Sequence, residues 1–372
     1  MTTEQEQLLD FRVLKRPILI QGVRENRLYP ERQALIHSKT GKPFDVCSTQ
    51  YHPHQPREVV KDIEQAINGI AHITNLDVLR GGETVMLSCQ FNQDIQALHQ
   101  NETNGEANDE VDRFLATGQD LDYAARKQAR KDAGYRVGQA LNRGNLYRSG
   151  FKISIGNTVG NPCKVIGEVV EIVCLNGLLR TGARSFLIVN HRNRSLSVAE
   201  KIIAAIPELQ QETHQILQLR DQLTSTPADT KVMRTYLLEL TDKELFSQVL
   251  DKTIADRGQY TPDVQRNLFL DAVTSHDQVA WYLLDRIEAE GNRLCKRMNN
   301  HLTDQPLAAG TQGTLWQPYM AATYTIDHQS TAKGEYASDN RKLSSAFGEG
   351  AKVKLEALEL ATQYQQILAA RN

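Results

Sequence analysis

Apolar residues in the first half of the chain fall in short runs separated by turns, a pattern typical of β-strands. From Val85 to Phe91, apolar residues at odd positions alternate with Met86, Ser88 and Gln90, which predicts a strand with two different faces. Gly81 and Gly82 precede this run and predict a two-residue hairpin turn, because glycine readily adopts positive φ angles. Further strands are predicted at 17–20, 34–36, 44–49, 73–79, 151–155, 165–174 and 185–189, and a helix at 56–68.

After residue 196 the spacing of apolar residues is mainly helical. Ser197 to Glu200 and Thr241 to Glu244 predict capping boxes, in which a hydroxyl and a carboxylate bind the free amides of a first turn. Pro227 and Pro262 are both predicted at first helical positions. A last helix is predicted from about 351 to 368, after a helix-poor stretch from 302 to 340. The chain is therefore predicted to be α+β, with a mixed α/β domain over residues 1–196 and a mainly helical region over 197–372 that packs on it.

The composition is that of an ordinary folded protein. Of 372 residues, 40% are hydrophobic and 24% are charged. No apolar run approaches the roughly eighteen residues needed to cross a bilayer, and the N-terminus does not have the pattern of a signal peptide. The five cysteines are odd in number and include no Cys-x-x-Cys pair, so we expect free thiols in a reducing cytoplasm. We recognise no enzyme motif and predict neither a cofactor nor a metal.

Charge is distributed unevenly, although the net charge is only −2. Residues 92–122 contain eight acids and one base, which predicts an acidic loop. Residues 123–194, called the basic segment below, contain thirteen bases and three acids. A surface that approaches phosphates benefits from the loss of acids, because each carboxylate repels the phosphates that an arginine attracts. The basic segment is therefore the main candidate for a nucleic-acid interface.

Spacing within the basic segment is consistent with that interpretation. Arg126 and Arg130 are four residues apart in a predicted helix from 121 to 141, as are Lys127 and Lys131, so the four project from neighbouring faces. Tyrosines are interleaved with them, and bases of a single strand can stack on such rings. The predicted nucleic-acid-binding residues are Arg126, Lys127, Arg130, Lys131, Tyr135, Arg136, Arg143, Tyr147, Arg148, Lys152, Arg180, Arg184, Arg192 and Arg194.

Part of the same segment resembles a known family. Asn157 to Gly160, followed by Glu171 to Leu178, is similar to the turn and the valine-cysteine-x-asparagine strand of the phage/plasmid-like family known as domain of unknown function 932. Weaker similarity extends from about 44 to 360, although Met320 and Tyr324 stand where that family has asparagine and glutamate. The resemblance implies a phage or plasmid setting, in which DNA transactions dominate. The positions that carry it are Tyr51, Gly81, Gly82, Asn157, Cys174, Asn176, Gly177, Trp316, Asp327 and His328.

A shorter stretch, from Ala125 to Asn145, looks like the basic helix of single-strand annealing recombinases. The residues themselves also have plainer interpretations. Asparagine and glycine form turns, Cys174 has no base beside it and is expected to be a buried thiol, and Trp316 next to Leu315 is typical of a core.

Three functions follow from these patterns. The first is a mobile-element accessory protein that binds single-stranded DNA as a homo-oligomer. The second is a hydrolase or nucleotide-modifying enzyme that uses Asp327, His328 and Asn176. The third is a protein-binding or structural factor, whose basic surface meets an acidic partner or the acidic loop of another copy.

Overall fold

A computed structural model of the chain describes residues 3–21, 27–92, 147–171, 176–178, 187–189, 198–304, 311–329 and 334–371, and it confirms the α+β class. The strands are β1 Val13–Ile20, β2 Arg27–His37, β3 Pro43–Ser48, β4 Ala71–Leu79, β5 Thr84–Phe91, β6 Tyr147–Gly156, β7 Cys163–Glu171, β8 Asn176–Leu178 and β9 Leu187–Val189. The α-helices are α1 Thr3–Leu8, α2 Pro56–Ile67, α5 Val198–Thr224, α6 Thr230–Thr241, α7 Lys243–Thr253, α8 Pro262–Ser275, α9 Asp277–Glu290, α10 Arg293–Asp304, α11 Trp316–Tyr324, α12 Ala337–Phe347 and α13 Glu349–Ala369. Shorter helical turns are η1 Arg80–Gly82, η3 Arg257–Gln259 and the π-helix η4 Thr325–Gln329.

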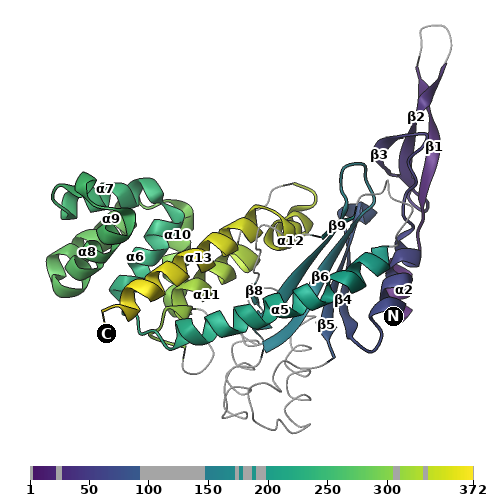
Figure 1. Cartoon of the computed structure of the whole chain (residues 1–372). Coiled ribbons are helices and arrows are strands. Elements are labelled where there is room, and N and C mark those ends of the chain that lie inside the picture. The colour runs from purple at the N-terminus through teal and green to yellow at the C-terminus, as the bar shows by residue number, and fades with distance from the viewer. Residues whose placement is uncertain are drawn as a thin grey trace.

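The main sheet has six strands in the order β4-β5-β6-β7-β8, with β9 also paired to β7. Its pairs are antiparallel, as expected for strands joined mostly to their sequence neighbours. On one face, Leu87, Phe151 and Val165 pack with apolar residues of α2 and of the first half of α5. The long α5 helix lies across the strands on this side (Figure 1).

The opposite face of the main sheet is covered by helices from the C-terminal end of the chain. Met86 packs against Ala346 of α12, and Ile166 packs against Ala351 at the start of α13. The predicted alternation along β5 is thereby confirmed, because its odd-numbered apolar side chains enter the first core and Met86 enters the second. Helices that follow these strands by 185 to 260 residues in sequence thus cover the second face of the main sheet, and the candidate site described below lies on this face.

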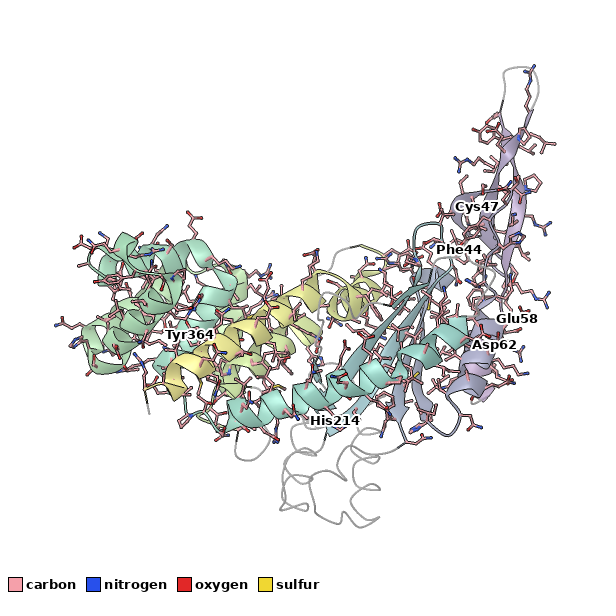
Figure 2. The ribbon with its side chains drawn as sticks, viewed as in Figure 1. Phe44, Cys47, Glu58, Asp62, His214 and Tyr364 are labelled. Atoms are coloured by element: carbon pink, nitrogen blue, oxygen red, sulfur yellow. The ribbon has the colours of Figure 1, made fainter. Side chains whose placement is uncertain are left out.

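The C-terminal helices form their own core around α6, α11 and α13. The second half of α5 contributes Ile216 and Leu223 to this core, so the helix joins the two halves of the molecule. Near its centre, Tyr364 donates a hydrogen bond to Glu239 at 2.8 Å, and Arg266 binds the same carboxylate at 2.6 Å. Figure 2 shows Tyr364 on α13 facing the helical region. The division at residue 196 remains a prediction, and α5 contributes to both cores.

Strands β1, β2 and β3 form a separate antiparallel sheet, and the β1–β2 hairpin projects away from the main body (Figure 1). Strand pairing between β1 and β2 extends from Val13 opposite His37 to Ile20 opposite Arg27. Only the base of this three-stranded sheet is covered by the rest of the described chain, because Leu35 and Cys47 enter the core of the main sheet there. Phe44 and Cys47 mark this base in Figure 2. We call β1, β2 and β3 the arm.

Several local predictions need correction. The β4–β5 turn has four residues instead of two, because Leu79 pairs with Thr84, although Gly81 and Gly82 have the predicted positive φ angles. Helix α6 begins at Thr230 with Asp229 as its cap, so Pro227 is not a first helical residue. The stretch predicted to be helix-poor contains α11 and η4. Eight of the nine residues of α11 are buried, so the helix has no polar stripe that would reveal its period.

Other local predictions are confirmed or displaced by one residue. Pro262 is the first residue of α8, and α13 matches the predicted last helix. The second capping box is displaced, because α6 continues through Thr241 and Asp242 caps α7 by accepting from the Leu245 amide at 3.1 Å. Ser197 and the helix predicted from 121 to 141 lie outside the described residues. Among the described helices, none is long and apolar enough to cross a membrane.

Candidate functional site

Four charged side chains meet between the second face of the main sheet and the C-terminal helices. Lys152 of β6 pairs with Glu168 of β7, and Lys354 of α13 pairs with Asp327 of η4. We call these four residues the charge cluster. The two lysines and two carboxylates interact electrostatically across the cluster as well as within each pair. The formal charges therefore cancel in a place where water has little access.

The sheet half of the charge cluster follows from strand register. Lys152 lies opposite Ile166 in the β6–β7 pairing, and Glu168 lies two residues further along β7. Diagonal neighbours of this kind are within reach of a long side chain. The hydrogen bond between Lys152 Nζ and Glu168 Oε1 follows from that placement. Lys152 thus points into the protein and binds a carboxylate, in contrast to the phosphate contact predicted for it.

The helical half of the charge cluster joins three elements. Ser345 of α12 and Lys354 of α13 both bind the Asp327 carboxylate of η4. Lys354 Nζ also donates to Ser345 Oγ at 2.9 Å. Lys354 is 2% exposed and Asp327 is 12% exposed, so each charge depends on its partner for stabilisation. This arrangement holds η4, α12 and α13 together against the sheet.

The two lysines respond differently to the same surroundings. Burial lowers the pKa of Lys354, and the attraction of Asp327 only partly offsets the burial. Burial also disfavours the charged form of Lys152, but the adjacent Glu168 carboxylate outweighs that effect and raises the pKa of Lys152. A lysine whose pKa is lowered is more readily deprotonated and can act as a base or nucleophile. Lys354 has the electronic character for such chemistry, yet its 2% exposure leaves no surface for a substrate to contact.

Aromatic residues of α11 border the charge cluster. Burial, together with the Asp327 charge, raises the pKa of Tyr319, whose hydroxyl has no hydrogen-bond partner among the described residues. Trp316 is fully buried and its ring lies 5.1 Å from that of Tyr319, which confirms the core interpretation of this tryptophan. The His328 ring lies against Tyr324 at 4.7 Å. The Asp327 carboxylate is held by Lys354 and Ser345, which are not the partners that an Asp–His acid–base pair requires.

Four other positions that carry the family resemblance, Tyr51, Gly81, Gly82 and Asn157, lie where the arm joins the main sheet. The Asn157 side chain donates to the Gly82 carbonyl at 2.7 Å, and the Tyr51 hydroxyl lies 3.5 Å from the carbonyl of Thr158. Burial raises the pKa of Tyr51 to about 12. Gly82 has a φ of 100°, and a Cβ there would approach His37, Phe11 and Phe44 to within 3.0–3.2 Å. These positions therefore shape the junction, and Asn157, in the loop between β6 and β7, also binds the turn between β4 and β5.

Most predicted nucleic-acid-binding residues lie outside the part of the chain that the structure describes. Tyr147, Arg148, Asn176 and Gly177 lie in β6 and β8, where only the backbone is described for them. The residues that lie outside the described part are Arg126, Lys127, Arg130, Lys131, Tyr135, Arg136, Arg143, Cys174, Arg180, Arg184, Arg192 and Arg194. Four of the five cysteines are described, and all four are free and buried, as predicted.

The main sheet does show where the basic segment is attached. Phe91 ends β5, and Tyr147 begins β6 directly opposite Glu171, the last residue of β7, so residues 93–146 leave and return at one end of the sheet. Val189, which precedes residues 190–197, pairs with Cys163 at the other end of β7. At about 3.3 Å per residue, the two ends of β7 are roughly 26 Å apart. The segments that carry the predicted contacts are thus anchored at both ends of the sheet.

Three members of this site were not predicted from the sequence: Glu168, Ser345 and Lys354. One signal was present: Lys354 falls between Ala351 and Leu358 at the three- and four-residue spacing of the apolar stripe of α13. A charged residue at such a position is buried and needs a partner. Among the described residues, no group of three or more histidine, cysteine or acidic side chains is placed to hold a metal ion.

Comparison with known proteins gives no match. No family model, curated protein or solved structure is significantly similar to this chain. The likeness to the phage/plasmid-like family therefore stays a prediction from the residues quoted above.

Proposed function

We propose that this protein binds single-stranded DNA through the basic segment, as an accessory factor in a DNA transaction of a mobile element. The observation that carries the proposal is the count of thirteen bases and three acids over residues 123–194. A folded surface normally mixes both signs, whereas a surface for phosphates benefits from the absence of carboxylates.

Strand geometry refines the set of contacts. Lys152 is excluded, because it is bonded to Glu168 on the covered face of the sheet. With Lys152 and Glu168 neutralising each other, twelve bases and two acids of the segment remain. Parts of the basic segment are attached at both ends of β7. This favours phosphate contacts that are spread along a strand of DNA over contacts that are confined to one point.

An enzymatic role has less support than binding. Asp327 is engaged by a buried lysine and a serine, and Lys354 has almost no exposed surface. The charge cluster is better explained as the connection between the main sheet and the C-terminal helices. Its place in the fold would position the sheet that anchors the basic segment.

A salt titration tests the proposal. Binding of a fluorescein-labelled oligothymidine of thirty nucleotides is measured by anisotropy between 20 and 300 mM NaCl. For single strands the slope of log K against log salt is about −0.7 per neutralised phosphate, so four or more contacts give a slope steeper than about −2.8. Replacing Arg126 and Arg130 by alanine should reduce the steepness by about 1.4.

Lys243 and Lys252 provide the matched control. Both are exposed lysines on α7, which lies in the helical lobe away from the main sheet (Figure 1). Their double replacement by alanine removes the same charge and should leave the slope unchanged. Absent binding at 20 mM NaCl, or an equal loss in the control, would refute the proposal.

A further inference from the structure

The arm exposes apolar side chains that the rest of the described chain does not cover. Leu19 and Leu28 lie opposite each other in the β1–β2 pairing, and they are 61% and 63% exposed. Val46 of β3 is also exposed, beside Ala34 on β2. Apolar residues on a projecting hairpin gain nothing from the fold of their own chain, so such a surface indicates a partner.

The charge of the arm restricts the kind of partner surface that the arm can bind. Residues 12–32 contain six bases and two acids. Arg16 and Arg32 are exposed, and neither forms an ion pair within the described part of the chain. The partner surface must therefore combine apolar side chains with carboxylates.

Helix α8 carries such a surface. Val264 and Leu268 of α8 are exposed and four residues apart, which places them along one side of the helix, and the exposed Tyr260 lies two residues before the first residue of α8. Asp263 and Asp271 border the stripe, and both remain largely exposed although they bind Arg266 and Arg371. We call these five residues the α8 stripe. Residues 243–290, which form α7, α8 and α9, contain nine acids and five bases, so the whole lobe is acidic.

The arm and the α8 stripe lie at opposite ends of an elongated molecule (Figure 1). One chain therefore cannot bring its own two surfaces together. We propose that copies of this chain associate head to tail, with the arm of one copy bound to the α8 stripe of the next. Leu19 and Leu28 would cover Val264 and Leu268, and Arg16 and Arg32 would meet Asp263 and Asp271. Such a heterologous contact leaves one free surface at each end and builds a ring or an open filament.

Trp281 is another exposed apolar residue of the same lobe, at 70%, and it provides a control. It lines a cavity of about 230 Å³ between α6 and α9, together with Lys231, Arg234 and Asp277. Lys231 pairs with Asp277, so Arg234 leaves the lining with a net positive charge that disfavours a basic arm, and we do not assign this cavity as the receptor surface.

Sedimentation velocity of the nuclease-treated full chain tests the proposal in the absence of DNA. The wild-type chain should form species larger than a monomer as concentration rises. Leu28→Asp in the arm and Leu268→Asp in the α8 stripe should each weaken association by at least about tenfold, the loss typical of residues central to an interface. Trp281→Ala should leave association unchanged. Circular dichroism checks that the substitutions, all at exposed sites, leave the fold intact.

Mixing the two aspartate variants gives the sharpest readout. In head-to-tail contact each variant keeps one intact surface, so the mixture should form a species of two chains and stop there. A monomeric wild-type chain, a variant that still assembles alone, or a mixture without the two-chain species would overturn the proposal. A Leu28→Asp variant that assembles like the wild type but no longer binds DNA would also overturn the proposal, because the arm would then contact nucleic acid. Apart from that last result, none of these outcomes depends on whether the basic segment binds DNA.

Discussion

Replacing Lys354 by methionine tests the interpretation of the charge cluster. Methionine keeps most of the buried stem and removes only the ammonium group. Asp327, which is 12% exposed, then loses its strongest partner and keeps Ser345. Removing one member of a buried ion pair costs about 3–5 kcal/mol, because the other charge is left uncompensated. Lys152 still acts on Asp327 from the sheet, and the lowered pKa of Lys354 means that its own charge is costly to bury, so we expect a loss below that range, about 1–2 kcal/mol.

The same electrostatics predict that removing both charges costs much less. The pKa of Lys354 is lowered, which means that burial disfavours its charge more than Asp327 stabilises it. The pair as a whole therefore contributes little net stability. A Lys354→Met, Asp327→Leu double variant should lie within about 1 kcal/mol of the wild type, so the two substitutions together should cost less than the sum of their separate losses.

Equilibrium urea unfolding at pH 7 measures these differences. Trp316 is fully buried, so its fluorescence reports the loss of the helical core. Lys352 lies two residues away on the same helix at 68% exposure, and Lys352→Met should change the free energy of unfolding by less than about 0.5 kcal/mol. If Lys354→Met is as stable as the wild type, or if the two substitutions are additive, the charge cluster does not hold the helices to the sheet.

Two further predictions concern pH and the arm junction. Between the lowered folded pKa of Lys354 and its ordinary value of 10.5, the unfolded chain binds a proton that the folded chain does not. The stability of the wild type relative to Lys354→Met should therefore rise as pH increases toward 10.5, and a constant difference up to that pH would contradict the assignment. Gly82→Ala should cost about 2 kcal/mol, because a positive φ and three ring contacts oppose a Cβ. Gly160→Ala, with a φ of +83° and open space around it, should cost about 1 kcal/mol, so equal losses would show that the packed junction is unimportant.

The proposals for DNA binding and for assembly concern different surfaces. The basic segment is attached to the main sheet, whereas the arm and the α8 stripe lie at the two ends of the molecule. A head-to-tail array would place successive basic segments in a row, which suits a polymeric ligand. Each proposal nevertheless has its own experiment, and failure of one leaves the other intact.

Local patterns predicted much of the secondary structure. The β5 alternation, the positive φ angles at Gly81 and Gly82, Pro262 at the start of α8 and the extent of α13 all depend on near neighbours in sequence. Predictions failed where burial is uniform, as in α11, since a helix buried on all sides has no polar stripe. The predicted N-cap of α7 was one residue too early, because Asp242 caps this helix and its neighbour Thr241 does not.

What the sequence determined by itself is the α+β class and the uneven distribution of charge. Both follow from the order of residue types along the chain. Only the tertiary structure decided that Lys152 faces Glu168, that Lys354 meets Asp327, and that Asn157 joins Gly82. Glu168 and Asp327 are 159 positions apart in sequence, and their proximity results from packing α12 and α13 on the second face of the main sheet. A side chain's partner depends on which distant face covers it, and no local pattern carries that information.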